Sequence, residues 1–200
     1  MTKGQLYSIV LIELGLESQD RRAHPQSVFL AADTFRGTAI PSYIKAHGDD
    51  SISLFCYEAI LPVAFDDVRG RYYVQLNFQI LGMDDNKGLV QVSLPQEDEG
   101  SFIGLKNGMM SVYSGLEAGG AAGRTVYWIS GNRIYFNNLS VGAENILVKA
   151  IPTIYDLISD DEQVPMPMEF NRVVIDGVKQ ALNPAAFIAQ DKVNDGRQGV

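Results

Sequence analysis

The chain has 200 residues, a length that fits one domain or two small ones. It is 46% hydrophobic and 20% charged, so it can bury a sizeable core and carries less charge than the roughly 25% usual for soluble domains. The net charge is −8, and the sixteen Lys and Arg residues are scattered, with no basic run longer than Arg21-Arg22. Since binding to DNA phosphates requires a basic stripe, this pattern argues against direct nucleic-acid binding, while an acidic wall that repels DNA is compatible with it.

Cysteine content and hydropathy limit the cellular setting. Cys56 is the only cysteine, which excludes an intramolecular disulfide and fits synthesis in a reducing cytoplasm. It lies in an apolar run, which favours a buried structural thiol over a nucleophile. The start of the chain lacks the features of a secretory signal. Residues 6–16 are apolar but include Glu13 and fall short of the ~20 residues of a membrane span, so we expect no membrane association.

The amino-terminal segment has the pattern of a helix. Thr2 and Gln5 have capping-box spacing, in which the Thr hydroxyl caps the first turn and the Gln side chain reaches back. Apolar residues follow at helical spacing, and Gly15 is suited to end the helix. Because the segment is apolar on nearly all sides, it requires cover on several faces. This fits a core helix of one domain or a helix shared with a neighbouring subunit.

A second helix is predicted after a polar loop at residues 18–24. It starts near Gln26 and runs to Ile40 or slightly beyond, where Pro41 interrupts or ends it. One face of this helix is apolar and consists of Val28, Ala31, Ala32, Phe35 and Ala39.

The pattern changes to strand chemistry at Gly48 and keeps it to about Pro152. Alternating or short apolar runs predict strands at residues 52–60, 71–80, 89–94, 125–130, 133–136 and 145–151. A tight hairpin is predicted at Gly131-Asn132, because Gly adopts φ > 0 freely. Short strands with frequent turns indicate an antiparallel sandwich or an open barrel.

The chain returns to helical patterns after the last predicted strand. Residues 154–159 fit a helical turn, and the acidic residues 160–162 are expected to be exposed. Pro167 is well placed as the first residue of a final helix, which Asn183-Pro184 ends. The apolar face of this helix consists of Phe170, Val173, Val174, Val178, Ala181 and Leu182.

These elements predict an α+β fold. We expect the amino- and carboxy-terminal helices to pack together and to flank an antiparallel β-sandwich or barrel-like insert, with an extended C-terminal tail. The corresponding units are a discontinuous helical docking domain at residues 1–47 and 153–184, a β domain at residues 48–152 and a tail or arm at residues 185–200.

No motif predicts a catalytic nucleophile or a metal centre. There is no Gly-x-Ser-x-Gly elbow, and the only two histidines, His24 and His47, lie in a polar loop and beside a predicted helix end. Two isolated histidines and one cysteine lack the spacing of a metal site. A calcium loop counted from Asp84 fails, because its sixth position is Leu89 and its twelfth is Pro95.

The sequence also lacks motifs for a phosphate-binding loop or for a catalytic pair of carboxylates. The glycine-rich residues 115–123 lack the ending of a P-loop and the spacing of a dinucleotide fingerprint. The Asp doublets fall at predicted turns, where Asp is common. They are Asp49-Asp50, Asp66-Asp67, Asp84-Asp85 and Asp160-Asp161. We therefore predict no catalytic, cofactor-binding or metal-binding residue and no cofactor, and we expect that the protein is not an enzyme.

Several features together resemble a known class of phage proteins. They are the apolar amino-terminal helix, the second helix, the strand-rich middle with residues 127–136 (YWISGNRIYF), the acidic stretch and Pro-x-Pro at residues 160–167, and the tail residues 191–196. This combination is similar to the ring or adaptor (head-to-tail connector) proteins of crAss-like and related short-tailed bacteriophages. The resemblance covers most of the chain as a general layout and includes no catalytic motif.

The resemblance implies a virion subunit that docks below the portal in a closed, dodecameric ring and joins the capsid to the tail around the DNA path. Its partners would be further copies of itself, the portal and other tail or ring proteins, while DNA passes through the channel without specific binding. It would occupy the head-to-tail region of the virion, and the host cytoplasm before assembly. A head-to-tail contact that closes on itself makes a ring, and residues 185–200 are expected to form an arm that contacts another subunit.

Two functions of other classes stay open. One is a carbohydrate- or receptor-binding β module of a phage tail that uses Trp128 and the tyrosines as stacking platforms, although an aromatic residue in mid-strand more often packs in a core. The other is a hydrolase that uses a pair of carboxylates.

Overall fold

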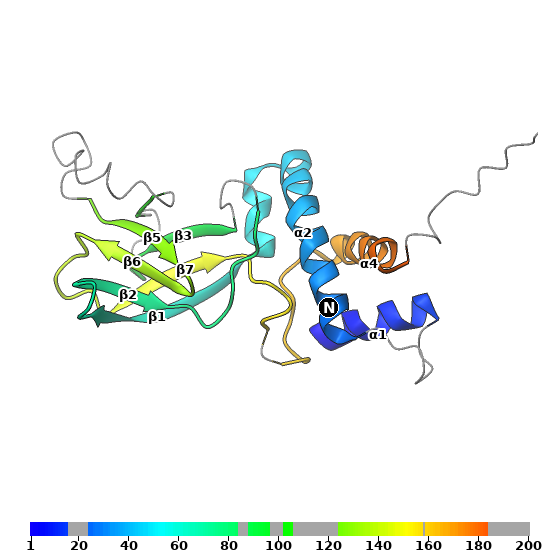
Figure 1. Cartoon of the computed structure of the whole chain (residues 1–200). Helices are drawn as coiled ribbons and strands as arrows, with labels where there is room; N and C mark the ends of the chain where they lie inside the picture. Colours follow the sequence, from blue (N-terminus) through cyan, green and yellow to red (C-terminus); the bar gives the residue numbers. More distant parts are fainter. Residues whose placement is uncertain (16–23, 84–87, 97–101, 106–123, 158, 184–200) are drawn as a thin grey trace, which may run out of the picture.

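The computed structural model describes residues 1–15, 24–83, 88–96, 102–105, 124–157 and 159–183. Within these residues a β-sheet lies at one end of the molecule and three α-helices lie at the other (Figure 1). This arrangement confirms the predicted α+β class, in which helices from both ends of the chain flank a β insert. The predicted tail at residues 185–200 lies outside the described residues.

Helix α1 (Lys3–Leu14) begins and ends as predicted. The Thr2 hydroxyl accepts a hydrogen bond from the Gln5 amide (3.2 Å), and the Gln5 side chain accepts one from the Thr2 amide (2.9 Å). These two bonds form the predicted capping box. Gly15 ends the helix at φ 65°, in the left-handed region that favours glycine.

Helix α1 packs against α2, α4 and the segment before α4, so it is covered on several faces as expected, except at Ile12. Leu6, Val10 and Leu11 are buried, whereas Ile12 is 58% exposed. The first turn of α1 also lies against the segment before α4, because the amides of Lys3 and Gly4 donate to the carbonyls of Glu162 (3.1 Å) and Asp160 (2.8 Å).

Helix α2 (Pro25–His47) continues past Pro41, where the sequence predicted an interruption or an end. Proline removes one backbone hydrogen bond and crowds the preceding turn. Packing on both sides of Pro41 offsets this cost. Ile40 is fully buried, and the ring of Tyr43 meets the ring of Phe170 edge-on at 5.4 Å.

The predicted strand at residues 52–60 is wrong in its first half. Asp49–Phe55 forms a 3-10 helix, η2, and strand β1 (Tyr57–Asp66) starts later and runs farther than expected. The hydroxyls of Ser51 and Ser53 donate to backbone carbonyls three residues earlier, at 2.6 and 2.7 Å. Such local bonds compete with strand pairing and favour tight turns.

The β insert is one curled sheet. Besides β1, its strands are β2 (Arg71–Gln75), β3 (Leu89–Ser93), β4 (Ile103–Gly104), β5 (Val126–Ser130), β6 (Arg133–Asn137) and β7 (Asn145–Ala150). Among the described residues the strand order is β3-β7-β1-β2-β6-β5-β4. All neighbours pair antiparallel except β4 and β5, which are parallel. The sheet is thus an open half barrel, the second of the two predicted forms.

The curl brings the two edge strands of the sheet close together. The amide of Phe102, immediately before β4, donates to the carbonyl of Val92 in β3 at 2.7 Å. The enclosed core consists of Leu61, Val74, Leu76, Phe78, Val92, Ile134, Phe136, Ile146, Val148 and Ala150.

The predicted hairpin is confirmed, with Gly131 at φ 60° in the turn between β5 and β6. The predicted strand at residues 71–80 is shorter than expected, because β2 ends at Gln75. The next amide, that of Leu76, donates to the carbonyl of Asn132 in the hairpin turn (2.9 Å). Leu76 and Phe78 are buried although they lie beyond the end of β2, so the apolar alternation predicted their burial correctly but not their pairing in a strand.

Helix α4 (Met168–Leu182) starts one residue later than predicted, with Pro167 as its N-cap. Its predicted apolar face is too wide, because Val173 is 45% exposed and Ala181 is exposed as well. A Cβ at Gly177 would overlap the ring of Phe35, so this glycine allows α4 to approach α2 closely.

The helices share a second core with residues of the insert. Its buried members are Leu6, Val10, Val28, Phe29, Ala32, Ile40, Phe55, Leu81, Met83, Ile151, Ile154, Leu157, Val164, Phe170, Val174, Ile175 and Val178. Four of them, Phe55, Leu81, Met83 and Ile151, come from the predicted β unit at residues 48–152. The helical core therefore contains residues from both of the predicted units.

A buried ion pair joins the two parts of the molecule. Arg36 is fully buried, and its Nη1 atom donates to Asp33 Oδ1 and to the carbonyl of Pro152, both at 3.0 Å. The Asp33 carboxylate also accepts the amides of Ile154 (2.8 Å) and Tyr155 (3.1 Å). Burial raises the pKa of Asp33, while Arg36 and the two amides act against that effect. The pair thus holds the segment that leaves β7 against α2.

Lys3 holds the same segment from another side. Its Nζ atom donates to the carbonyls of Leu157 (2.7 Å) and Tyr155 (3.2 Å) and lies 4.9 Å from the centre of the Phe29 ring. The side chain is buried, so these contacts replace water around the ammonium group. The carbonyls of this segment therefore serve as ligands for one buried cation from α1 and one from α2.

We predict that Arg36→Ala lowers the free energy of unfolding by about 3–5 kcal/mol, because it leaves the buried Asp33 carboxylate without its cation. Urea denaturation of both proteins measures the change. Arg124→Ala, at an exposed position, is the matched control and should change stability by less than about 0.5 kcal/mol. A loss in Arg36→Ala no larger than that of the control would contradict this account of the junction.

Candidate functional site

The two histidines lie at opposite ends of α2 and do not form one site. His24 caps the helix, and its Nδ1 atom accepts the Gln26 amide at 3.3 Å. The His47 ring stacks on Tyr43 at 4.0 Å between ring centres. A helix of 23 residues is about 35 Å long, which is far beyond the reach of a shared catalytic group. Both histidines therefore act at helix ends.

Two of the three Asp doublets that the structure describes lie at turns, as predicted, whereas Asp49-Asp50 lies in a 3-10 helix. Asp49-Asp50 opens η2, Asp66-Asp67 begins the turn between β1 and β2, and Asp160-Asp161 lies in the turn before α4. The doublet Asp84-Asp85 falls outside the described residues.

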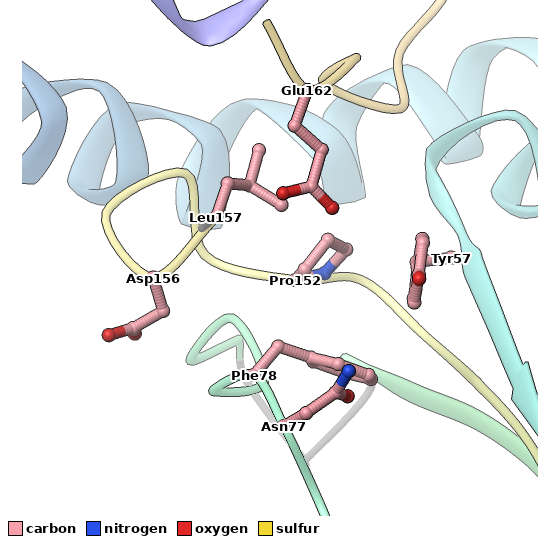
Figure 2. Close-up of a pocket in the computed structure, with 7 residues that line it drawn as sticks. All are labelled: Tyr57, Asn77, Phe78, Pro152, Asp156, Leu157 and Glu162. Atoms are coloured by element: carbon pink, nitrogen blue, oxygen red, sulfur yellow. The ribbon is translucent and has the colours of Figure 1, made fainter. Parts of the chain in front are cut away.

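A small cavity lies between the sheet and the segment that follows β7 (Figure 2). It is lined by Tyr57, Asn77, Phe78, Pro152, Asp156, Leu157 and Glu162. Its volume is about 10 Å³, room for about one water molecule. The carboxyl group of Asp156 points away from Glu162 and accepts the Thr153 hydroxyl at 2.7 Å. These two acids therefore do not form the facing pair that a hydrolase requires.

A larger and open hollow of about 330 Å³ lies between the end of β3 and the loop from β6 to β7. It is lined by Leu94, Pro95, Gln96, Ser140, Val141, Gly142, Ala143, Glu144 and Asn145. Glu144 is the one ionisable residue among these described lining residues, so they offer no acid–base pair.

The described residues contain neither a metal-binding cluster nor a membrane-spanning helix. In that part of the chain, no group of three or more His, Cys, Asp or Glu side chains is placed to hold a metal ion. No described helix is both long enough and apolar enough to cross a bilayer.

The outer side of the sheet carries a row of aromatic rings, which we call the ring stack: Tyr73, Tyr135 and Trp128 on β2, β6 and β5. The register places Tyr73 opposite Tyr135 and Tyr135 opposite Trp128, so the rings are cross-strand neighbours. Trp128 and Tyr135 are nearly parallel with ring centres 5.6 Å apart, and Tyr73 lies 5.7 Å from Tyr135.

Arginines cover two rings of the stack. The Arg69 guanidinium lies 4.6 Å from the centre of the Tyr135 ring, and that of Arg133 lies 4.4 Å from the centre of the Tyr73 ring. Both distances fall within the range of cation–π attraction. As a result Tyr135 is only 2% exposed.

Asp66 fixes the turn that places Arg69 over the stack. Its carboxylate accepts the amides of Val68 and Arg69, both at 3.1 Å, and the Tyr135 hydroxyl at 3.0 Å. The Arg69 amide, as the largest influence, and the Tyr135 hydroxyl lower the pKa of Asp66. Asp66 is thus held as an ionised structural group, which weighs against its use as a proton donor.

The ring stack bears directly on the carbohydrate-binding alternative. A sugar that stacks on an aromatic side chain needs a free ring face. Tyr135 is almost fully covered, and Tyr73 has Tyr135 and Arg133 as neighbours. Trp128 lies partly exposed on the outside of the sheet, whereas the sequence favoured a place in the core. The arrangement stabilises the sheet and leaves little aromatic surface for a ligand.

Large apolar side chains are exposed where β1 turns into β2. We call them the tip patch: Phe65 (50% exposed), Val68 (96%) and Tyr72 (48%). Phe65 and Tyr72 are cross-strand partners with ring centres 5.0 Å apart. They lie on the side of their strands that faces the barrel core, because they are two residues from Val63 and Val74. The turn lies at the end of the sheet away from the helices (Figure 1).

Sequence reasoning named the aromatic residues but missed Arg69, Arg133 and the tip patch. Arg133 stands two residues before Tyr135 in a predicted strand, so its place on the same face could have been found from the period of a strand. Arg69 acts from a turn, and no periodicity places a turn residue over a sheet. The tip patch follows an apolar alternation that normally indicates burial.

No protein-family model matches this chain, and no curated protein matches it either. The function of the protein therefore has to be inferred from the geometry of the described residues.

We predict that Asp66→Asn destabilises the protein at neutral pH but not in acid. The folded pKa of Asp66 lies below its ordinary value of 3.8, so its stabilisation is present above that value and is lost as the pH falls through the folded pKa. Urea denaturation across this pH range measures the difference between wild type and variant, with the neighbouring Asp67→Asn as control. A difference that does not change with pH would contradict the role of the charge.

We also predict that Cys56 reacts slowly with iodoacetamide. Burial, and to a lesser degree the Glu58 carboxylate, raise the pKa of the thiol from 9.0 to about 11, and its Sγ atom donates to the Ile52 carbonyl at 3.3 Å. At pH 8 the native protein should react roughly a hundredfold more slowly than the urea-unfolded chain, because the thiolate is the reactive form. Equal rates in the two states would show that Cys56 is an accessible thiol.

Proposed function

We propose that the chain is a virion structural subunit that forms a ring in the head-to-tail assembly of a phage and joins the portal to the tail around the DNA path. The observation that carries this proposal is the tip patch, where Phe65, Val68 and Tyr72 expose large apolar side chains at the end of the molecule away from the helices. A permanent neighbour in an assembly would cover them.

The energetics favour a protein partner at the tip patch. Burial of a large apolar side chain contributes about 1.5–3 kcal/mol, so three such residues can supply a substantial part of a docking energy. The patch sits on a hairpin whose turn is fixed by Asp66 and by the contact of Arg69 with Tyr135. A rigid turn loses little entropy on binding, which suits a docking element.

The remaining features agree with an assembly role. The layout resembles phage ring or adaptor proteins, and the net charge of −8 suits the wall of a channel through which DNA slides. His24 caps a helix, and Asp66 fixes a turn. Heterologous contacts between copies would close the ring. The number of copies implied by the resemblance is twelve, and the virion would be the final location of the protein.

We expect the chain to co-purify with the portal protein of the same phage genome as closed rings in negative-stain images. Val68→Asp should lower the recovered complex roughly tenfold or more, because it places a charge in an apolar contact. Its thermal unfolding should match that of wild type, since Val68 is 96% exposed.

Met168→Asp, at another exposed apolar residue, is the matched control and should keep full recovery. A wild-type chain that stays monomeric beside the portal protein would overturn the proposed function. Wild-type recovery of Val68→Asp would instead place the docking contact elsewhere.

A further inference from the structure

The exposed side of α2 lacks charge over most of its length. We define the outer face of α2 by its exposed residues Gln26, Ser27, Leu30, Thr34, Thr38 and Ser42. Between residues 25 and 44 the only charged residues are Asp33 and Arg36, and both are buried in the junction with the sheet. About five turns of a surface helix therefore present no charge to the outside.

Three of the four hydroxyl groups on this face, those of Thr34, Thr38 and Ser42, are bonded within the helix. Thr34 donates to the Leu30 carbonyl at 2.8 Å, Thr38 to the Phe35 carbonyl at 2.9 Å, and Ser42 to the Thr38 carbonyl at 3.5 Å. Such back-bonding satisfies the hydroxyl donors locally. A surface that covers Thr34, Thr38 and Ser42 therefore leaves none of these three hydroxyl donors unpaired.

Helix α4 shows what an ordinary surface helix of this chain looks like. Its exposed side carries Glu169, Arg172 and Asp176, and Arg172 bridges to Glu13 of α1 at 2.7 Å. A charged outer face is typical of helices that face water. Depletion of charged residues is, in contrast, the mark of the centre of a protein interface.

We propose that the outer face of α2 is the surface through which one copy of this chain contacts a second copy. This inference rests on the proposed function and names the contact between ring subunits. Two copies that each carry a net charge of −8 repel one another, so close approach is favoured where neither copy presents a charge. Thr34, Thr38 and Ser42 have small side chains whose hydroxyls are already bonded, so they allow that approach without an unpaired hydroxyl donor.

Other partners fit this face less well. Nucleic acid requires cations to neutralise its phosphates, and the face has none. A strongly charged protein would be matched by complementary charge, which the face also lacks. The position of α2 agrees with a lateral contact, because the helix runs across the molecule between the sheet and the other two helices (Figure 1).

Sedimentation velocity of the purified full chain over a range of concentrations tests the proposal. The test variant is the double substitution Thr34→Glu and Thr38→Glu, which suits a helix because Glu has a higher helix propensity than Thr. The matched control adds the same charge to exposed positions of α4, as Gln180→Glu with Ala181→Glu. Circular dichroism and thermal unfolding of all three proteins verify that each is folded.

We expect multimers of wild type and control and a shift of the Thr34/Thr38 variant to monomer, with self-association weakened roughly tenfold or more. Equal multimers of the test variant and wild type would overturn the proposal, and so would a wild-type chain that is monomeric throughout the range. Neither result removes the tip-patch contact with the portal protein, which the co-purification experiment tests separately. Failure of wild type to bind the portal protein would conversely overturn the proposed function, whatever the self-association.

Discussion

The fold depends on a short stretch of backbone that leaves β7 and turns toward α4. Asp33 accepts two amides of this stretch, Arg36 donates to one of its carbonyls, and Lys3 donates to two more. Three charged side chains thus satisfy backbone groups that burial would otherwise leave unpaired. Breaking a buried pair is costly, whereas the pair itself adds little net stability, so the arrangement specifies how sheet and helices meet more than it strengthens the whole.

The parts of the fold that local chemistry determines were predictable from the sequence. The Thr2 capping box and the Gly131 turn each depend on a few adjacent residues. The buried side of α2 was not predictable in the same way. Asp33 and Arg36 face the interior, but a search for apolar periodicity leaves charged residues out. The strand prediction for residues 52–55 is wrong for a related reason. Ser51 and Ser53 bond to nearby carbonyls, and the apolar pattern of the sequence does not reveal this competition with strand pairing.

The candidate contact surfaces show the same division. The ring stack follows from strand period for its aromatic members, but the cover that Arg69 gives it depends on a turn held by Asp66. The tip patch and the outer face of α2 are recognised by the exposure of their side chains. Exposure depends on the tertiary structure, so local sequence patterns do not predict it. The tip patch is apolar, whereas the outer face of α2 is polar but uncharged, so the two surfaces suit different kinds of contact.

The helical core is built from both ends of the chain, and this has a consequence for biosynthesis. On the ribosome α1 and α2 emerge first, while α4 and the segment that Lys3, Asp33 and Arg36 bind emerge only after the whole sheet. Until then the apolar side of α2 and its Asp33–Arg36 ion pair are open to solvent or to chaperones. The half barrel precedes α4 along the chain, but it is complete only when β7 pairs with β1 and β3. The helical core, and with it the final packing of α2, can therefore be completed only after α4 has emerged.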